Sequence, residues 1–328
     1  MLNNPRILVV SPASSASNNG NWQTAYRWAQ FLRARYHVEI AGQWDSASPP
    51  PDALIALHAR RSADSIQAYA KTGRPLVVVL TGTDLYRDIA SDATAQASLA
   101  AADRLIVLNE LGTRSLPGAV RAKARVLLQS CAERRPLAKT ATHLRALMVG
   151  HLREEKSPRT YFEAARLLAP RPDILLDHVS AALDPMLGAE AAALMRTCPR
   201  YRWLGGVPHA AARRRIQAAH VLVHASRMEG GAHVVIEAVR SGTAVLASHI
   251  DGNVGLLGED YAGYFPVGDA AALAAILQRV RDEPALLARL QFQCAARAAL
   301  FDPAREAACL KSVVREILDG AEADLRGP

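Results

Sequence analysis

Short apolar runs alternate with amphipathic stretches through the first part of the chain. The runs are rich in Val, Ile and Leu, which is typical of strands buried on both faces of a sheet. Between them, apolar residues recur at helical spacing, which predicts helices over 22–35 and 62–71. The predicted strands are 6–10, 38–40, 52–57, 75–80, 105–108 and 125–128. Strand and helix in this order predict a doubly wound parallel sheet.

A polar and basic segment, 129–144, interrupts this pattern and contains Pro136. The alternation then restarts, and Ser157-Pro158 fits the N-cap and first position of a helix. The strands predicted in this part are 145–149, 174–180, 201–204, 221–224 and 243–247, and the closing helices are 270–281, 284–299 and 303–318. The chain therefore repeats its architecture on either side of the polar segment.

The length of 328 residues accommodates two domains of ordinary size. We predict an α/β fold of two doubly wound, Rossmann-like domains that face a cleft, with 129–144 as the hinge. The expected domains are 1–135 and 136–300, and 301–328 is expected to form a helix that packs back toward the N-terminal domain. Ligands of such sheets bind at the carboxyl ends of the strands.

The positive charge is uneven along the chain. Lys and Arg number 39 against 31 Asp and Glu, and 17 against 10 of these lie between Met1 and Thr140. The basic residues are scattered and no aromatic platform lies among them, which argues against nucleic-acid binding. Two explanations remain open: a cleft that attracts an anion, or a solvated basic surface that reflects a general preference for arginine. The run 213–215 is interpreted as a solvated helix face.

Other classes of protein are disfavoured by simple counts. No apolar run approaches the roughly 20 residues of a membrane-spanning helix, and the N-terminus does not resemble a secretory signal. The four cysteines are far apart with no CxxC pair, so we expect neither a zinc site nor a disulfide framework. A cytoplasmic protein without an integral membrane segment is expected, and the sequence does not indicate its oligomeric state.

The most informative stretch is 226–238, where a predicted strand ends, Gly230-Gly231 makes a turn and a helix begins. Backbone amides at the start of a helix suit a diphosphate. Glu229 and Glu237 lie eight positions apart, and carboxylates beside a phosphate site make sense as acceptors for sugar and ribose hydroxyls. The alternative is that both are salt-bridged surface residues.

This stretch resembles the E-x7-E segment of retaining glycosyltransferases with the GT-B fold, the family that includes sucrose- and lipopolysaccharide-type transferases. The resemblance implies that Glu237 holds the nucleotide ribose and that Glu229 contacts the donor sugar. Segment 241–247 resembles the strand that follows in the family, with Thr243-Ala244 where Thr-Pro is usual. Segment 251–253 takes the place of a Gly-Gly loop.

Segment 149–156 is similar to the family's G-R-L-x-x-x-K motif, whose Arg and Lys hold the departing diphosphate. Lys156 matches, His151 stands at the Arg position, and Arg153 would supply the charge instead. The resemblance implies that Lys156, Arg153 and Glu229 are the catalytic residues. The nucleotide-sugar site would add His151, Ser226, Arg227, Gly230, Gly231, Ala232 and Glu237.

The acceptor and diphosphate side is expected at four places. The family's loop after the first strand corresponds to Asn18, Asn19, Gly20 and Asn21, and strand ends supply His58 and Thr81, Gly82, Thr83 and Asp84. Many related transferases have His-Gly where this chain has Thr81-Gly82. His233 would donate to the acceptor phosphate or merely cap its helix, His58 would be an acceptor ligand or a core residue, and loop 18–21 would be functional or a surface turn.

Segments 58–62, 80–88, 151–156 and 227–233 together resemble the selenosugar synthases of selenoneine biosynthesis. This resemblance implies transfer of a sugar from UDP-N-acetylglucosamine to selenophosphate, with release of UDP and phosphate. No Asp-x-Asp motif stands in a strand context, so we expect no cofactor and no essential metal. The basic first half would suit such a trianionic acceptor, although an anionic lipid would also suit it. The alternatives are a retaining glycosyltransferase with a conventional acceptor, a UDP-sugar epimerase of the same fold, and a non-catalytic binding protein.

Overall fold

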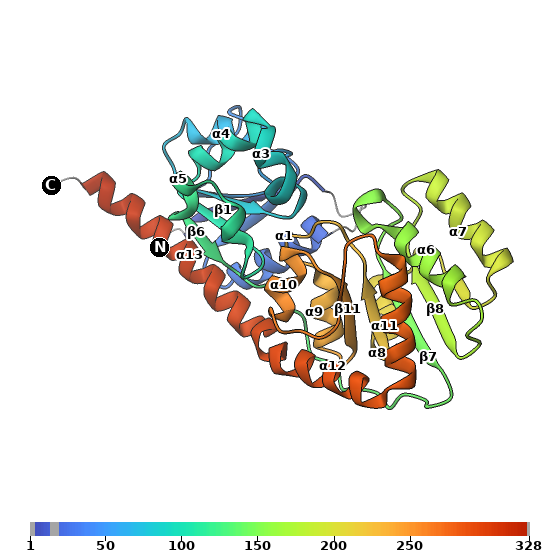
Figure 1. Ribbon diagram of the computed structural model, residues 1–328. Coiled ribbons are helices and arrows are strands. Elements are labelled where there is room, and N and C mark those ends of the chain that lie inside the picture. The colour runs from blue at the N-terminus through green and yellow to red at the C-terminus, as the bar shows by residue number, and fades with distance from the viewer. Residues whose placement is uncertain (1–3, 14–19, 327–328) are drawn as a thin grey trace. The chain divides into compact units, whose positions relative to one another are not determined.

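The computed structural model describes residues 4–13 and 20–326, with side chains as far as residue 320. Asn18 and Asn19 of the predicted acceptor loop therefore lie outside the described residues. The chain divides into two compact units, Met1–Gln129 with Pro303–Pro328, and Ser130–Asp302 (Figure 1). Each unit is built on its own sheet.

The sheet of the first unit has six parallel strands in the order β2-β1-β3-β4-β5-β6. All residues of β3 and β4 are buried, as their continuous apolar runs predict. The strands are β1 (Arg6–Val10), β2 (His37–Ala41), β3 (Ala53–Leu57), β4 (Leu76–Leu80), β5 (Arg104–Val107) and β6 (Ala124–Val126). Strands β3 and β4 end at the centre of the sheet, next to the predicted acceptor residues.

Helices cover both faces of this sheet. One core contains α1 (Gly20–Leu32) and α13 (Pro303–Arg326), and the opposite core contains α2 (Ala63–Ala70) and α4 (Ala93–Ala101). Glu306 is buried on α13 and accepts hydrogen bonds from Trp28 Nε1 at 2.7 Å and from Arg27 Nε at 2.9 Å. The last helix is thus part of the first unit's core. The remaining short elements are η2 (Asp84–Asp88), α3 (Ile89–Ser91), η3 (Gly112–Ser115) and α5 (Gly118–Arg121).

The second unit repeats the design with strand order β12-β11-β10-β7-β8-β9, again all parallel. Its strands are β7 (Leu144–Val149), β8 (Ile174–Val179), β9 (Tyr201–Trp203), β10 (Val221–His224), β11 (Ala244–Ser248) and β12 (Tyr264–Phe265). Its helical elements are η4 (Glu154–Lys156), α6 (Pro158–Leu167), α7 (Pro185–Thr197), α8 (His209–Ala218), α9 (His233–Val239), α10 (Asp251–Leu257), α11 (Ala270–Asp282), α12 (Pro284–Arg297) and η5 (Ala298–Phe301). The prediction of an α/β fold with two doubly wound sheets is confirmed.

Segment 251–253 and Arg213 differ from what the sequence predicts for them. Segment 251–253, expected as a loop, forms the first turn of α10. Arg213, expected on a solvated face, is only 5% exposed, whereas Arg214 and Arg215 are exposed as predicted. Arg213 lies on the inner side of α8 with Ala212 and Ile216, and its Nη2 donates to the carbonyl of Ala132 at 2.9 Å. A buried arginine is tolerated there because it has polar partners.

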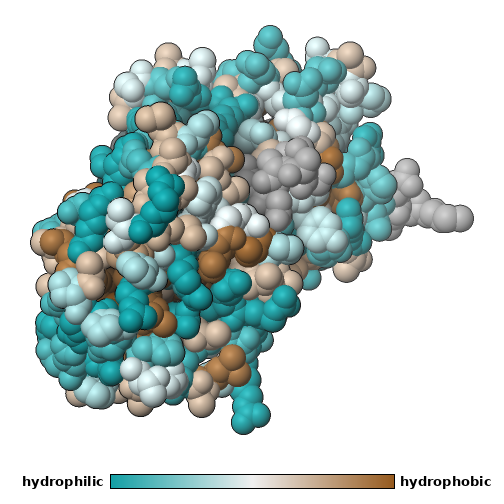
Figure 2. All heavy atoms as spheres, turned by 90° about the vertical axis from the view of Figure 1, so that its right-hand side faces the viewer, coloured by the Kyte–Doolittle hydropathy of each residue, from teal (hydrophilic) through white to brown (hydrophobic). Residues whose placement is uncertain are grey.

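None of the helices in the described part of the chain is both long enough and apolar enough to cross a bilayer. On the face shown in Figure 2, hydrophobic side chains form small patches separated by hydrophilic ones. That face, as far as the structure describes it, offers no broad apolar surface.

Candidate functional site

Two neighbouring strands of the second unit deliver the predicted donor-site segments to the same edge of the sheet. Strands β7 and β10 pair in parallel, with Val221 opposite Ala146 and Val223 opposite Met148. The chain segments that follow them, 150–156 and 225–232, therefore begin side by side. The backbone amide of Arg227 donates to the carbonyl of Glu155 at 2.8 Å, which ties the two segments together.

Lys156 and Glu229 form an ion pair at this junction. Lys156 Nζ contacts Glu229 Oε1, and the side chains are only 17% and 12% exposed. Glu229 Oε1 also lies 3.4 Å from Nε2 of His224, the last residue of β10. Burial opposes the charge of Glu229, but the positive charge of Lys156 and the hydrogen bond to His224 outweigh it and hold the pKa of Glu229 well below its usual range. Glu229 is therefore an ionised acceptor at neutral pH.

His224 is oriented from behind by α10. Asn253 Nδ2 donates to the carbonyl of Ser248 at 2.8 Å, which leaves its Oδ1 to accept from Nδ1 of His224 at 2.9 Å. Nε2 of His224 then faces Glu229 and the hydroxyl of Ser226, which is 3.2 Å away. Ser226 is buried, and its carbonyl accepts from Ser248 Oγ at 2.5 Å. His224 and Asn253 were missed in the sequence because a single His and Asn give no pattern until the sheet and α10 are assembled.

The turn that carries Glu229 packs against the backbone of α10. A Cβ built on Gly252 would lie 2.0 Å from the carbonyl oxygen of Glu229. Only glycine allows the two backbones to lie this close, because a backbone carbonyl, unlike the end of a flexible side chain, cannot rotate away from a Cβ. Gly252 thus sets the position of Glu229 from the neighbouring element.

The loop after β7 holds two further nitrogen-bearing side chains. Nδ1 of His151 and Nε of Arg153 are buried, and neither has a hydrogen-bond partner among the described residues. Burial, followed by the positive charges of Arg153 and Lys156, lowers the pKa of His151, so that its ring is neutral at neutral pH. The Nε–H of Arg153 is thus a buried donor without a partner there, which costs free energy that an anionic ligand would recover.

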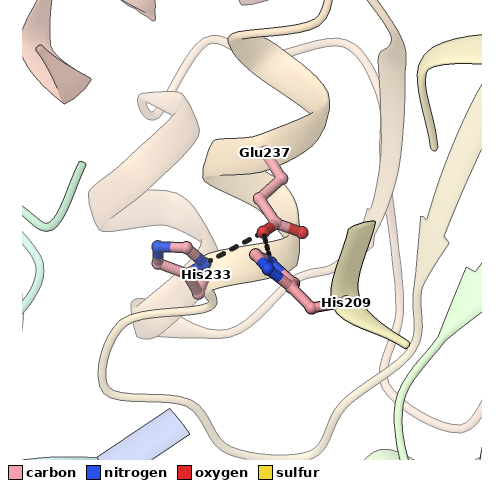
Figure 3. A group of neighbouring side chains, drawn as sticks. All are labelled: His209, His233 and Glu237. Carbon is pink, nitrogen blue, oxygen red and sulfur yellow. Dashed lines mark hydrogen bonds and ion pairs between the residues drawn. The ribbon is translucent and has the colours of Figure 1, made fainter. Parts of the chain in front are cut away.

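Glu237 lies on α9 among basic side chains (Figure 3). Oε1 of this carboxylate is 2.5 Å from Nε2 of His209, 3.4 Å from Nδ1 of His233 and 3.9 Å from Nε of Arg213. Burial alone would raise the pKa of Glu237, but the hydrogen bond with His209 and the neighbouring imidazole of His233 lower it to about 2. The helix begins at His233, after Ala232 as N-cap, and Gly230 and Ala232 are buried in the preceding turn.

His209 and Arg213 were not predicted as site residues. They lie four residues apart on α8, which places them on one face of that helix. This spacing could have indicated that both residues face the same site. The interpretation of 213–215 as a solvated charge run excluded Arg213 from it. Among the described residues, His209, His233 and Glu237 also place their nitrogen and oxygen atoms close enough together to bind a metal ion.

The described residues that were predicted on the acceptor side lie in the first unit, except His233, which lies on α9 of the second unit. His58 directly follows β3 in a left-handed conformation, with φ 74°, and its Nδ1 accepts from the amide of Arg61 at 3.3 Å. Its Nε2–H is then directed to Thr83 Oγ1 at 3.0 Å. Burial, more than the opposing charge of Asp84, lowers the pKa of His58 and keeps the ring neutral.

Asp84 holds the ends of β3 and β4 together. Its Oδ1 accepts from the amides of Thr81 and Gly82 at 2.8 Å each, and its Oδ2 accepts from the amide of Ala59 at 2.9 Å. The structure gives Asp84 this positioning role, because its oxygens are engaged by backbone amides. Gly20 and Asn21 begin α1 in the same unit.

The structure thus collects the predicted residues into two groups. The second unit brings His151, Arg153, Lys156, Ser226, Arg227 and Glu229 to the ends of β7 and β10, with Glu237 and His233 on α9. The first unit holds His58 and residues 81–84 after the ends of β3 and β4, and Gly20 and Asn21 at the start of α1.

A family model described as glycosyl transferases group 1 matches residues 131–297. The match covers half of the chain and contains every donor-site residue named above. The chain belongs to this glycosyltransferase family. The resemblance seen in the E-x7-E segment is thereby confirmed at the level of the family.

Solved structures agree with this glycosyltransferase assignment in fold. Sucrose-phosphate synthase from Thermosynechococcus elongatus aligns over 96% of this chain and 100% of its own, with 19% identity and a TM-score of 0.77. Anabaena HepE in complex with UDP and glucose aligns over 95% and 100%, with 15% identity and a TM-score of 0.74. A trehalose-phosphate synthase from Burkholderia vietnamiensis aligns over 86% and 75%, with 13% identity and a TM-score of 0.68. The chain has the GT-B fold. A sequence search of curated proteins finds no match.

Proposed function

We propose that this glycosyltransferase takes its sugar from a UDP-sugar and that the second unit binds this donor. The observation that carries the proposal is the junction of β7 and β10, where Lys156 pairs with an ionised Glu229. Beside this pair lie buried nitrogens of His151 and Arg153 that have no hydrogen-bond partner in the described part of the chain. Cationic groups there suit a diphosphate, and the carboxylate suits sugar hydroxyls. The family match and the UDP-bound HepE structure support the same donor class.

Each side chain then has a task in the transfer. Lys156 and Arg153 stabilise the negative charge that develops on the departing UDP. Glu229, held ionised by Lys156 and His224, accepts hydrogen bonds from the sugar, and Glu237 accepts from the ribose. These protein cations supply the charge stabilisation, so we propose that catalysis needs no metal and no cofactor.

We propose selenophosphate as the acceptor and UDP-N-acetylglucosamine as the donor. The bond from the sugar C1 to the UDP oxygen breaks, a bond from selenium to C1 forms, and water then cleaves the selenium–phosphorus bond to release phosphate. Selenium is strongly nucleophilic, so the transfer needs no strong protein base. The excess of basic residues before residue 140 supports an anionic acceptor.

The direct test is incubation of the protein with UDP-N-acetylglucosamine and selenophosphate, followed by mass spectrometry. A selenosugar together with stoichiometric UDP is the expected result. Turnover of a simple sugar or lipid acceptor with no selenosugar would overturn the acceptor and leave the donor assignment standing. Conversion of the UDP-sugar without any acceptor would indicate an epimerase, and binding without UDP release would indicate a non-catalytic protein.

A further inference from the structure

Three side chains of the second unit lie close together, and the proposed sugar transfer does not explain why all three are there. The metal-binding atoms of His209, His233 and Glu237 all lie within 4.8 Å of one another. Figure 3 shows both imidazole rings directed at the same carboxylate. Two histidines and one carboxylate form a ligand set that leaves a fourth position open on a tetrahedral ion.

The tautomer of His233 is set by its second nitrogen. Its Nε2 lies 3.1 Å from the carbonyl oxygen of Ser130, and a carbonyl can only accept, so Nε2 carries a proton. In the neutral ring, Nδ1 then presents a lone pair to Oε1 of Glu237 at 3.4 Å. Two electron-rich atoms face each other unless a proton or a metal ion lies between them. A histidine that donates its outer N–H to a backbone carbonyl is the usual arrangement of a metal ligand.

The spacing also fits an ion. Zinc binds nitrogen and oxygen ligands at about 2.0–2.2 Å, which places two ligand atoms of a tetrahedron about 3.5 Å apart. The His233–Glu237 separation of 3.4 Å already has this value. The His209–Glu237 separation of 2.5 Å must open by about 1 Å to admit zinc. His209 can move, since it is the first residue of α8 and its side chain is 48% exposed.

We propose that His209, His233 and Glu237 bind a divalent transition-metal ion of the zinc class, and that the bound ion excludes the nucleotide-sugar donor. The exclusion rests on the proposed function, in which Glu237 holds the ribose. Two imidazoles favour zinc over magnesium and calcium, which prefer sites made of oxygen. Arg213 Nε, 3.9 Å from Glu237 Oε1, adds a positive charge, so the affinity is lower than that of a structural zinc site.

Binding is tested by calorimetric titration of the EDTA-treated protein with Zn²⁺, and with Co²⁺ for its visible absorption. One ion per chain is expected, with no Mg²⁺ binding at the same place. His209→Ala and Glu237→Gln should each weaken binding about a hundredfold. His37→Ala is the control, because His37 Nε2 also lies 3.1 Å from a carboxylate, Glu39, without belonging to the three-ligand group. Unchanged folding of His209→Ala, checked by circular dichroism, separates the loss of a ligand from unfolding.

Exclusion of the donor is tested by repeating the zinc titration with saturating UDP. A lower apparent zinc affinity with UDP, in the wild type and not in Glu237→Gln, supports the proposal. No zinc binding, or equal binding in the wild type and His209→Ala, overturns the metal site. Equal zinc affinity with and without UDP overturns the exclusion alone, and UDP binding measured in EDTA tests the proposed donor site independently of any metal.

Discussion

Replacing Lys156 by methionine is the sharpest perturbation of the donor site. Methionine keeps most of the volume of the side chain, which is 17% exposed, and removes only the ammonium group. Two effects follow from the structure. The departing UDP loses a preorganised cation, which costs about 10²–10³ in kcat, or roughly 3–4 kcal/mol. Glu229 loses its partner in a site with 12% exposure, which costs about 3 kcal/mol of folding stability.

The double variant Lys156→Met with Glu229→Gln separates these effects. Removing the stranded carboxylate should restore most of the thermal stability, since no unpaired charge remains. It should not restore turnover, because the cation that stabilises UDP is still missing and the carboxylate that binds the sugar is also gone. Lys71→Met is the control, because Lys71 is exposed and lies in the first unit, so neither property should change.

The assay is continuous detection of UDP release at saturating donor and acceptor, paired with thermal unfolding of each variant. A turnover number of Lys156→Met within about threefold of the wild type would refute the reasoning. A threefold loss corresponds to only a small fraction of the expected increase in activation free energy. Recovery of turnover in the double variant would also refute it. In that case Lys156 would act only by neutralising Glu229.

Three further predictions concern stability. The pKa of Glu237 is lowered to about 2, so its contribution to the free energy of unfolding is complete above its usual pKa and is lost as the pH falls from about 4.5 to 2. Denaturant titrations should show that the free energy of unfolding of the wild type exceeds that of Glu237→Gln by about 3 kcal/mol. This difference should vanish over the same pH range. Gly252→Ala places a Cβ against a backbone carbonyl and should cost about 1–3 kcal/mol in urea unfolding, whereas Gly118→Ala, with open space around it, should cost nothing. Glu306→Ala removes the partner of the buried Trp28 and of Arg27, whose side chain is 17% exposed, and should cost about 3 kcal/mol. Glu316→Ala on the same helix, at 38% exposure, should cost less than about 1 kcal/mol, and equal melting temperatures would contradict the structure.

Much of the fold could be predicted from local patterns. Parallel strands buried on both faces require unbroken apolar runs, and β1 and β10 have the predicted bounds. The ends of other strands move by one or two residues, because hydrogen bonding to neighbouring strands, rather than hydrophobicity, decides where a strand stops. The last helix continues through Gly320 to Arg326 instead of ending at 318, because a single glycine lowers helix propensity without stopping a helix.

The candidate site, like the fold, could be predicted only in part from the sequence. The sequence by itself determined the residues that carry recognisable spacing: Glu229 and Glu237 eight positions apart, and Lys156 at the end of its motif. It also determined that these follow strands, because strand ends are visible as the ends of apolar runs. The contacts between them depend on strand order, which no local pattern encodes.

Only the tertiary structure decided how each side chain is used. The pairing of β7 with β10 brings Lys156 to Glu229, and α10 supplies Asn253 to orient His224. The packing of α8 against α9 buries Arg213 and directs His209 at Glu237, which turns an apparent surface charge run into part of the site. Burial and the charge of a residue's neighbours are properties of the assembled fold, and they decide which carboxylates stay ionised and which histidines stay neutral.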